Sequence, residues 1–456
     1  MGMALYESVV PGIPGHISTA GTMYQFNDVT LPEPGAQYHW PTVANNALTR
    51  VIDTLFRTAT VANKDSLIKI TAYYNDLFAS QVSAQIFNDS KSFGESIGTD
   101  IINYSRTDGA HNGFATNFPP GYIPPVGDDL WVPYGTQVAL QPYWGNNRPF
   151  IEADSSADAI SPPPPPFSTV PGSEFYEYAY QVYETGLNLT QEQMNIATYW
   201  ADGGGTITPP GHSISMLKSI LIDENANLEM AAIAYAKLGI AVSDAFLACW
   251  KTKYIYNLCR PVTYIRTHID SNWLPLIGTP PFPEYTSGHS SQSGAMSAVM
   301  SDIFGPAYSF TDMTHGSNFG GPRSFDSFEE AAREAAVSRL YGGIHYEFGN
   351  EAGLDLGYFV GNNVNNLFEE LNVATEEHNP MASLNIFPNP AVETLTVSGT
   401  NLYGTSYQLI DLYGKVLTDG KLNDQVTTLS IGMLTPGIYI LQAGNDYRHT
   451  YKVVKN

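Results

Sequence analysis

Three segments far apart in the sequence concentrate side chains that can hold an oxyanion. The residues are Lys253 and Arg260, then Ser287, Gly288 and His289, then Arg339 and His345. Lysine and arginine supply positive charge, and the flat guanidinium group matches the edge of an oxyanion. Two histidines add groups that exchange protons near neutral pH. If the segments meet in the fold, the sequence predicts a site for a tetrahedral or bipyramidal oxyanion.

The first segment is expected at the end of a long helix. Residues 224–256 have apolar side chains at helical spacing, no proline and one glycine, Gly239, which favours a single helix. Two helical turns place Lys253 and the approach to Arg260 on one face. Pro261 disfavours helical geometry at Arg260, so we expect the helix to end there. Cations are also stabilised at a helix C-terminus, so a purely structural interpretation stays open.

The second segment combines a Ser-Gly turn with the start of a helix expected over 290–304. Backbone N–H groups at such a start point at whatever lies in front, which suits an anion. Ser287 and Gly288 would then donate hydrogen bonds to it. An ordinary serine N-cap beside a solvent-facing His289 explains the same residues without a function.

Two capping boxes, Thr190-x-x-Gln193 and Ser327-x-x-Glu330, predict helix starts. The third segment ends the helix that Ser327 opens. Gly342-Gly343 breaks this helix and allows His345 to fold back toward Arg339. Taken alone, these two residues are also consistent with a salt bridge and a hydrogen-bonded core histidine.

In this order and spacing, the motifs Lys-x6-Arg-Pro, Ser-Gly-His and Ser-Arg-x5-His resemble those of the vanadium-dependent haloperoxidases and the related type-2 acid phosphatases. The resemblance extends over most of residues 1–370 and includes the sequences at 273–276, 280–283 and 342–345. It looks closest to the secreted haloperoxidases of marine flavobacteria. It implies a mainly α-helical catalytic domain, residues 1–380, built as a helix bundle.

The resemblance also implies a cofactor and a role for each residue. Vanadate would be bound by Lys253, Arg260, Ser287, Gly288, His289, Arg339 and His345. His345 would be the metal ligand, through a neutral ring nitrogen, and His289 the acid–base for hydrogen peroxide. With Lys253 and Arg339 they form the expected catalytic set. The implied reaction oxidises iodide or bromide with hydrogen peroxide to hypohalous acid.

Two aromatic residues match positions near the halide side of the haloperoxidase pocket. They are Trp250 and Phe282, and simple core packing is the alternative. If they line the site, they form a dry wall that weakly hydrated iodide and bromide enter more easily than chloride does. These positions alone do not decide the halide.

The first alternative is an acid phosphatase of the same superfamily, in which His345 would attack phosphorus to give a phosphohistidine. Two positions depart from the phosphatase pattern. Gly349 stands where an aspartate usually orients the nucleophile, and Thr286 stands where proline is usual. Glu347 or a distant carboxylate would have to substitute for that aspartate. A second alternative is a non-enzymatic surface protein.

The remaining histidines and the two cysteines show no sequence spacing typical of metal ligands. The histidines are His16, His39, His111, His212, His268, His315, His378 and His449. We interpret them as structural or surface residues, with His212 a candidate for the site entrance. Cys249 and Cys259 are expected to be buried and unpaired.

The tail has a different composition. Of the net charge of −23, residues 384–456 contribute nothing, because their five acidic and five basic side chains cancel. Their short alternating apolar runs predict a small all-β sandwich, with a domain boundary near 380. The tail resembles the C-terminal sorting domain of type IX secretion, which implies the secretion machinery as partner and a secreted or cell-surface protein. Because no signal peptide opens the chain, the resemblance also implies a truncated N-terminus.

Charge and hydropathy exclude other partners. A charge of −23 argues against nucleic acid and anionic membranes, which need clustered Lys and Arg. No uninterrupted apolar run approaches the ~20 residues of a membrane span. The substrates that the family resemblance implies, a halide and hydrogen peroxide, are small.

Overall fold

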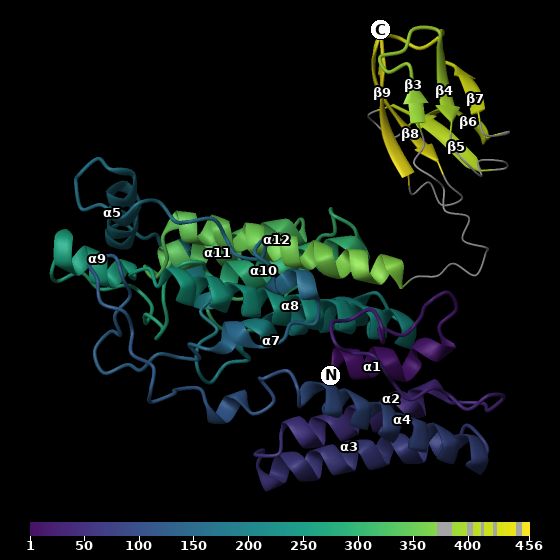
Figure 1. Ribbon diagram of the computed structural model, residues 1–456, viewed down its shortest axis with the longest axis horizontal. Coiled ribbons are helices and arrows are strands. Elements are labelled where there is room, and N and C mark those ends of the chain that lie inside the picture. Colours follow the sequence, from purple (N-terminus) through teal and green to yellow (C-terminus); the bar gives the residue numbers. More distant parts are fainter. Residues whose placement is uncertain (372–384, 399–404, 412–414, 423–425, 444–448) are drawn as a thin grey trace. The chain divides into compact units, whose positions relative to one another are not determined.

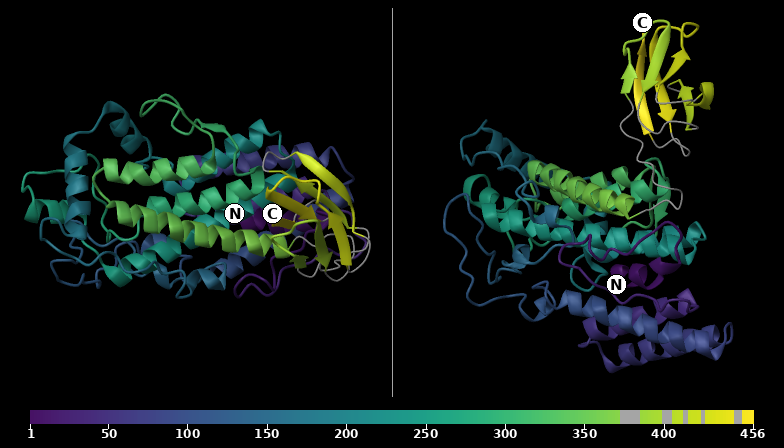
Figure 2. Two further views of the ribbon diagram at one scale, coloured as in Figure 1. Left: turned by 90° about the horizontal axis from the view of Figure 1, so that it is seen from above. Right: turned by 45° about the vertical axis from the view of Figure 1, so that its right-hand side comes forward.

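A computed structural model describes residues 1–371, 385–398, 405–411, 415–422, 426–443 and 449–456. Met1–Val373 form one compact unit and Ala374–Asn456 a second. The first is helical and the second is built of strands (Figures 1 and 2), which confirms the predicted fold class. The boundary expected near residue 380 lies outside the described residues.

The helices of the first unit are α1 (Gly2–Val9), α2 (Trp40–Leu55), α3 (Val61–Ala79), α4 (Ala84–Ser105), α5 (Glu174–Leu187), α6 (Gln191–Tyr199), α7 (Thr208–Asp223), α8 (Leu228–Tyr256), α9 (Pro261–His268), α10 (Gly288–Phe304), α11 (Phe328–Tyr341) and α12 (Glu347–Glu370). Short 3₁₀ turns are η1 (Val10–Gly12), η2 (Gly113–Ala115), η3 (Trp144–Asn146) and η4 (Glu152–Ser155). A small antiparallel hairpin joins β1 (Phe310–Asp312) to β2 (Arg323–Phe325). Between α4 and α5 the chain is rich in proline and glycine, and its backbone follows a long irregular course that includes η2, η3 and η4.

Helix α8 provides much of the apolar core of the helical unit. It is long and apolar enough to cross a membrane, but 72% of its most apolar window is buried inside the unit. Helix α10 packs against α8, α11 and α12, and Figure 1 shows these helices running along one another. The bundle forms because each helix must cover its apolar face with another.

The end of α8 differs from the expectation. The helix ends at Tyr256, and Asn257 follows in the left-handed conformation, which is a common way to terminate a helix. Arg260 has the extended backbone that Pro261 predicts, but the expectation that the helix ends at Arg260 is wrong, because it already ends at Tyr256. Arg260 instead caps the start of α9, so it approaches the site from a connecting segment and not from the α8 face that contains Lys253.

The two predicted capping boxes form to different extents. Thr190 and Gln193 make the complete reciprocal pair at the start of α6. Ser327 accepts the hydrogen bond from the Glu330 N–H. The Glu330 carboxylate, however, accepts from the backbone of Asp326. The second half of this box is thus displaced by one residue, while the helix start is where the sequence predicts it.

Glycines at four-residue spacing bring α12 very close to α10. A Cβ added at Gly353 would lie 2.7 Å from the Ser287 carbonyl oxygen, and one at Gly357 would lie 2.3 Å from that of Ser291. The backbone of Ser287 also donates a hydrogen bond to the Gly349 carbonyl oxygen at 2.9 Å. The start of α10 is therefore held directly against the first turns of α12.

The second unit contains two antiparallel sheets among its described residues. One has the order β3 (Asn385–Phe387), β4 (Thr394–Ser398), β7 (Val426–Ser430), and the other β6 (Val416–Lys421), β5 (Ser406–Ile410), β8 (Gly437–Ala443), β9 (His449–Lys455). Leu395 and Leu429 of the first sheet share one buried cluster with Leu409 and Leu441 of the second. The sheets therefore share a single core, as in the predicted sandwich.

The glycine contact leads to a stability prediction. Gly357→Ala should lower the free energy of unfolding by about 1–3 kcal/mol, the usual cost of overpacking. Gly239→Ala in α8 is the matched control, because a Cβ there meets no atom within 4 Å and only the helix-propensity gain of up to ~1 kcal/mol is expected. Urea unfolding measures both changes. A Gly357→Ala protein as stable as the Gly239→Ala protein would contradict the close packing.

Candidate functional site

A cavity of about 950 Å³ lies at the start of α10 and brings predicted site residues together. Gly288 and His289 line it from α10, Arg339 from the last turn of α11, and His345 from the segment between α11 and α12. Two of the three segments singled out by the sequence thus contribute directly to one cavity wall.

The residues of the first segment, and Ser287, lie behind that wall. All three are buried. Lys253 Nζ donates hydrogen bonds of 3.0 and 2.8 Å to two carbonyl oxygens of the loop 282–284, and Arg260 Nε donates one of 2.9 Å to a third. Ser287 caps α10 by accepting from the Ser290 N–H. The loop 282–284 is therefore the partner that holds both cations in place.

His345 has a defined tautomer. Its Nδ1 lies 2.6 Å from Glu284 Oε1, and its Nε2 lies 3.1 Å from Arg260 Nη1. Because a guanidinium group only donates, Nε2 must accept, and Nδ1–H donates to Glu284. Burial first, and the neighbouring cations next, lower the pKa of His345 well below its ordinary value. The ring is therefore neutral, with its lone pair on Nε2.

Glu284 occupies the space that a side chain at position 349 would need. A Cβ added at Gly349 would lie 2.4 Å from Glu284 Oε1. The carboxylate beside His345 therefore comes from a different segment than in the acid phosphatase pattern. Glu347, which we considered for this role, instead accepts a hydrogen bond from Gln181 at the surface. The distant carboxylate is Glu284.

His289 is oriented by a carbonyl group. It forms a hydrogen bond with the backbone of Trp200, while its buried Nε2 has no partner among the described protein atoms. The bond is therefore made by Nδ1. Arg339 Nη1 donates to the same carbonyl oxygen at 2.7 Å. Burial and then the charge of Arg339 lower the pKa of His289 well below its ordinary value, which leaves a lone pair on Nε2.

The three cations are only partly compensated. Burial, together with the charge of Arg260, lowers the pKa of Lys253 to about 7 and that of Arg339 to about 9. Glu284 offsets part of this effect at Lys253, and Asp202 part of it at Arg339. Positive charge out of water is costly without a counter-charge.

Unpaired donors show that the site fits an oxyanion. Arg260 Nη2 and Arg339 Nε are buried and have no hydrogen-bond partner among the described atoms. Buried donors without partners are rare and costly. A doubly charged tetrahedral oxyanion such as vanadate accepts several hydrogen bonds and supplies the missing negative charge. The residues present therefore fit that group.

The two predicted aromatic residues line the same cavity. The rings of Trp250 and Phe282 are tilted by 52° with their centroids 4.7 Å apart, and Phe246 extends the wall with its centroid 3.9 Å from that of Trp250. A Cβ at Gly288 would lie 3.5 Å from the Trp250 ring. The aromatic wall thus adjoins the start of α10.

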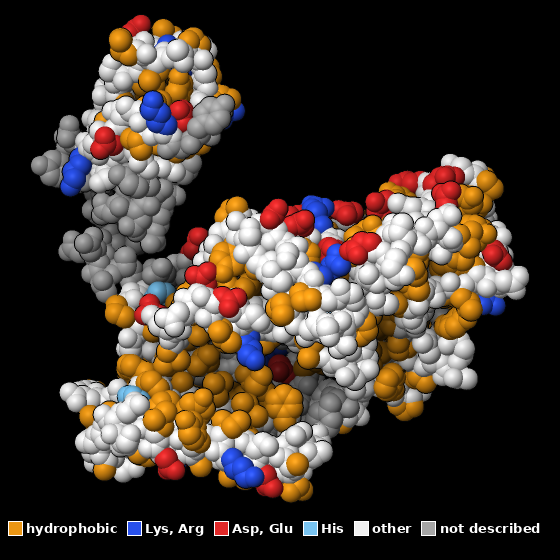
Figure 3. All heavy atoms as spheres, turned by 180° about the vertical axis from the view of Figure 1, so that it is seen from behind, with side chains coloured by type: hydrophobic (Ala, Val, Ile, Leu, Met, Phe, Trp, Pro, Cys, Tyr) orange, Lys and Arg blue, Asp and Glu red, His pale blue; other side chains and the backbone are white. Residues whose placement is uncertain are grey.

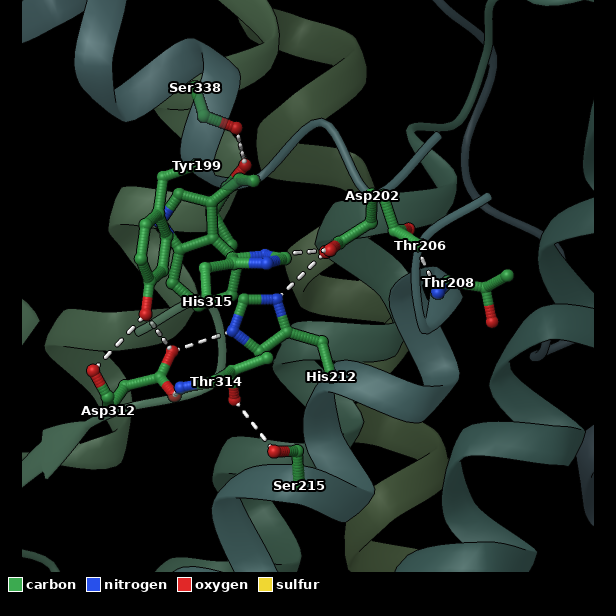
Figure 4. Close-up of polar contacts among 12 residues, drawn as sticks. Tyr199, Asp202, Thr206, Thr208, His212, Ser215, Asp312, Thr314, His315 and Ser338 are labelled. Carbon is green, nitrogen blue, oxygen red and sulfur yellow. Dashed lines mark hydrogen bonds and ion pairs between the residues drawn. The ribbon is translucent and has the colours of Figure 1, made fainter. Parts of the chain in front are cut away.

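His212, the candidate for the site entrance, is instead a buried residue, which agrees with the structural interpretation of the remaining histidines. Its ring nitrogens face Asp202 and Asp312 (Figure 4). Burial opposes charge on the ring, but the two carboxylates raise the pKa of His212 to about 9. The preceding residues Thr208 and Pro209 do line the cavity. The two cysteines are buried and free, as predicted.

Sequence reasoning missed Glu284, Trp200 and Asp202. The sequence did contain a signal for Glu284, since it is a carboxylate separated from the Ser-Gly-His segment only by Tyr285 and Thr286. Trp200 acts through its backbone, which no motif reveals. Asp202 follows a helix that the sequence does predict, but nothing local indicates that it faces the cavity.

The fold and this geometry define a helix-bundle protein with a buried, cationic oxyanion site. Residues 233–373 match the family model described as the VCPO second helical-bundle domain, and residues 385–456 match the secretion system C-terminal sorting domain. A vanadium chloroperoxidase of Curvularia inaequalis is 26% identical over 220 residues, which is 35% of this chain and 36% of that protein. The chain therefore aligns with about a third of the length of this curated relative.

Solved structures extend the likeness. A bacterial vanadium-dependent iodoperoxidase has a TM-score of 0.70 and 32% identity, with 80% of this chain and 88% of that one covered. The holo form of a bacterial vanadium-dependent chloroperoxidase has a TM-score of 0.62, at 17% identity over 82% of this chain and 90% of that one, and shows the shared fold. The chain belongs to the vanadium-dependent haloperoxidase family.

The buried Glu284 leads to a pH prediction. Burial raises the pKa of Glu284 to about 7, although Lys253 and Arg260 oppose the rise. The pKa of Glu284 is thus higher in the folded than in the unfolded protein. Its contribution to the free energy of unfolding is therefore fully present below the unfolded pKa and is lost as pH rises through about 7. Glu284→Gln keeps an acceptor for His345 but cannot ionise. Relative to the wild type, its stability should therefore increase between pH 4.5 and 7.

Urea unfolding across this pH range tests the expectation. Glu347→Gln is the matched control, because this glutamate contacts solvent and lies outside the cavity wall. The difference in free energy of unfolding between Glu284→Gln and the wild type should change with pH. The same difference for Glu347→Gln should not depend on pH. A difference independent of pH would show that Glu284 does not titrate in this way.

Proposed function

We propose that the protein oxidises iodide or bromide with hydrogen peroxide, with vanadate as cofactor. The observation that supports this most directly is a set of unpaired buried groups: Arg339 Nε and His289 Nε2 at the cavity wall, and Arg260 Nη2 behind it. Family membership supports the same cofactor. The iodoperoxidase is the relative that favours iodide as the halide.

In this proposal Lys253, Arg260 and Arg339 bind the vanadate and balance its charge. Ser287 and Gly288 contribute the start of α10, where backbone N–H groups favour an anion. The chemistry that vanadate supplies when bound is Lewis-acid activation of hydrogen peroxide toward oxidation of a halide. Binding of the cofactor and transfer of the proton are assigned to protein side chains.

The two histidines have different tasks. His345 is the proposed metal ligand, because its Nδ1–H donates to Glu284 and its Nε2 has the lone pair. His289 is the proposed acid–base. Its Nδ1 is held by the Trp200 carbonyl, so that Nε2 is the atom that accepts and returns the proton of hydrogen peroxide.

The aromatic wall of Phe246, Trp250 and Phe282 is the proposed halide side. Such a surface offers no hydrogen bonds to replace lost water, so it favours the anion that is easiest to dehydrate. The outer surface does not attract halides, since acidic side chains are spread over the face in Figure 3 with few basic ones among them. Capture therefore depends on the buried cations.

One observation favours the second candidate function, a phosphatase of the same fold. The Glu284–His345 hydrogen bond orients the ring as a nucleophilic histidine requires. In that case His345 Nε2 would attack phosphorus, and His289 would protonate the leaving group. Unlike the halide reaction, this one needs no vanadate.

We also propose that the protein is exported, to the medium or to the cell surface. The match of residues 385–456 to a sorting domain supports this. Secretion machinery would recognise that unit, whereas halide and hydrogen peroxide are the partners of the helical unit.

An assay separates the two reactions. Purified protein with orthovanadate should form triiodide from iodide and hydrogen peroxide, and it should cleave p-nitrophenyl phosphate slowly or not at all. His345→Ala should abolish triiodide formation, while His16→Ala, outside the cavity, should retain it. Ester cleavage without vanadate, together with no triiodide even when vanadate is present, would establish the phosphatase instead.

Binding of vanadate is tested separately by calorimetry. Arg339→Ala removes a buried cation and its unpaired Nε donor, and truncating one partner of a buried charge pair costs about 2–5 kcal/mol. We therefore expect the affinity for vanadate to fall at least ~30-fold, since 1.4 kcal/mol is about tenfold. Arg333→Ala is the control on the same helix, with its side chain 55% exposed. Equal affinities for the two variants would refute the assignment of Arg339.

A further inference from the structure

A second polar cluster lies beside the cavity, and none of its members has an assigned step in the proposed halide reaction, although the charge of its Asp202 acts on Arg339. It consists of Asp202, His212, Asp312 and His315, and we call it the Asp–His cluster (Figure 4). Asp202 follows α6, His212 belongs to α7, and Asp312 and His315 lie at the end of β1 and in the turn after it. Three separate segments thus contribute to it.

Three members present ligand atoms to a common point. Asp202 Oδ2 lies 2.8 Å from His212 Nδ1, and Asp202 Oδ1 lies 3.1 Å from His315 Nε2. One ligand atom from each of the three residues lies within 4.8 Å of the other two. In Figure 4 both imidazole rings point toward the Asp202 carboxylate. Two imidazoles and a carboxylate are the ligands that zinc and similar divalent transition metals prefer.

The fourth member supports the ligands from outside. Asp312 Oδ2 lies 2.6 Å from His212 Nε2 and accepts a hydrogen bond of 2.6 Å from the Tyr199 hydroxyl. A carboxylate that holds the far nitrogen of a metal-binding histidine is a recurring arrangement, because it fixes the tautomer. Here Asp312 holds the proton of Nε2, so Nδ1, which faces Asp202, is the nitrogen that binds a metal ion when the ion displaces its proton.

Burial and charge agree with a cation. The side chains of Asp202 and Asp312 are each 1% exposed, and that of His315 is 8% exposed. Two buried carboxylates match the charge of one divalent ion. Asp202 also lines the cavity, which provides a route of entry and room for a water ligand.

We propose that Asp202, His212 and His315 bind one divalent transition-metal ion of the zinc type, with Asp312 as the orienting carboxylate. The ion links the segment after α6 to α7 and to the turn after β1. Its ligand Asp202 is two residues after Trp200, whose carbonyl group orients His289 and Arg339. Its role is therefore structural support of the cavity wall.

Zinc binding to the full chain tests the proposal. The protein is prepared without a histidine tag, treated with EDTA and dialysed, and then titrated with ZnCl₂ in a calorimeter. We expect one Zn²⁺ per chain, a higher thermal midpoint with zinc, and no comparable binding of Mg²⁺. Co²⁺ in place of Zn²⁺ should give the visible absorption of an ion with nitrogen ligands.

Variants show whether the binding occurs at this cluster. His212→Gln and His315→Gln should each weaken zinc binding at least ~10-fold, and Asp312→Asn by about 10–100-fold, as is usual for outer-shell partners. His289→Ala, in the cavity, and His16→Gln should bind zinc like the wild type. Thermal unfolding in EDTA identifies any variant that fails to fold.

Two results would overturn the proposal. One is a wild-type protein that binds no stoichiometric zinc, which would make the cluster a network of hydrogen bonds only. The other is zinc binding that His289→Ala abolishes and that the His212 and His315 variants retain. Neither result depends on halide oxidation, so the outcome is independent of the proposed function.

Discussion

The burial of Lys253, Arg260 and Arg339 around one small volume is the constraint on which the rest of the site depends. Charges removed from water at such density are unfavourable unless anionic groups compensate them. The protein supplies Glu284 and Asp202 and leaves buried guanidinium nitrogens without partners. These unpaired donors can form hydrogen bonds with a bound oxyanion. Because the cations repel one another, the surrounding fold must keep them from moving apart.

Close backbone contacts provide that rigidity. Helices α10 and α12 approach through glycines, so the Ser287–His289 turn cannot shift without moving the segment that follows His345. The loop 282–284 binds Lys253 and Arg260 through carbonyl oxygens, and Trp200 binds Arg339 and His289 in the same way. Carbonyl oxygens are neutral acceptors. They orient the cations without neutralising the charge that is needed to attract an anion.

The pair Glu284 and Gly349 shows how one function can change its position in the chain. The role of the carboxylate is to hold a proton on Nδ1 of His345, and any segment that reaches this nitrogen can supply it. Because Glu284 fills the space beside position 349, only glycine is accommodated there. The departure from the acid phosphatase pattern is therefore a relocation of the carboxylate and not a loss of it.

The sequence by itself determined the fold class, the β tail, the helix starts at Thr190 and Ser327, and the residue types of an oxyanion site. These features depend on local periodicity, capping and motif spacing, which a linear sequence contains. Only the tertiary structure decided that Glu284 accepts the hydrogen bond from His345 and that the Trp200 carbonyl orients His289. It also decided that His212 is buried against Asp312 and that α8 ends before Arg260. Each of these is a contact between segments far apart in sequence or a backbone conformation, and side-chain identity does not encode which distant groups will meet.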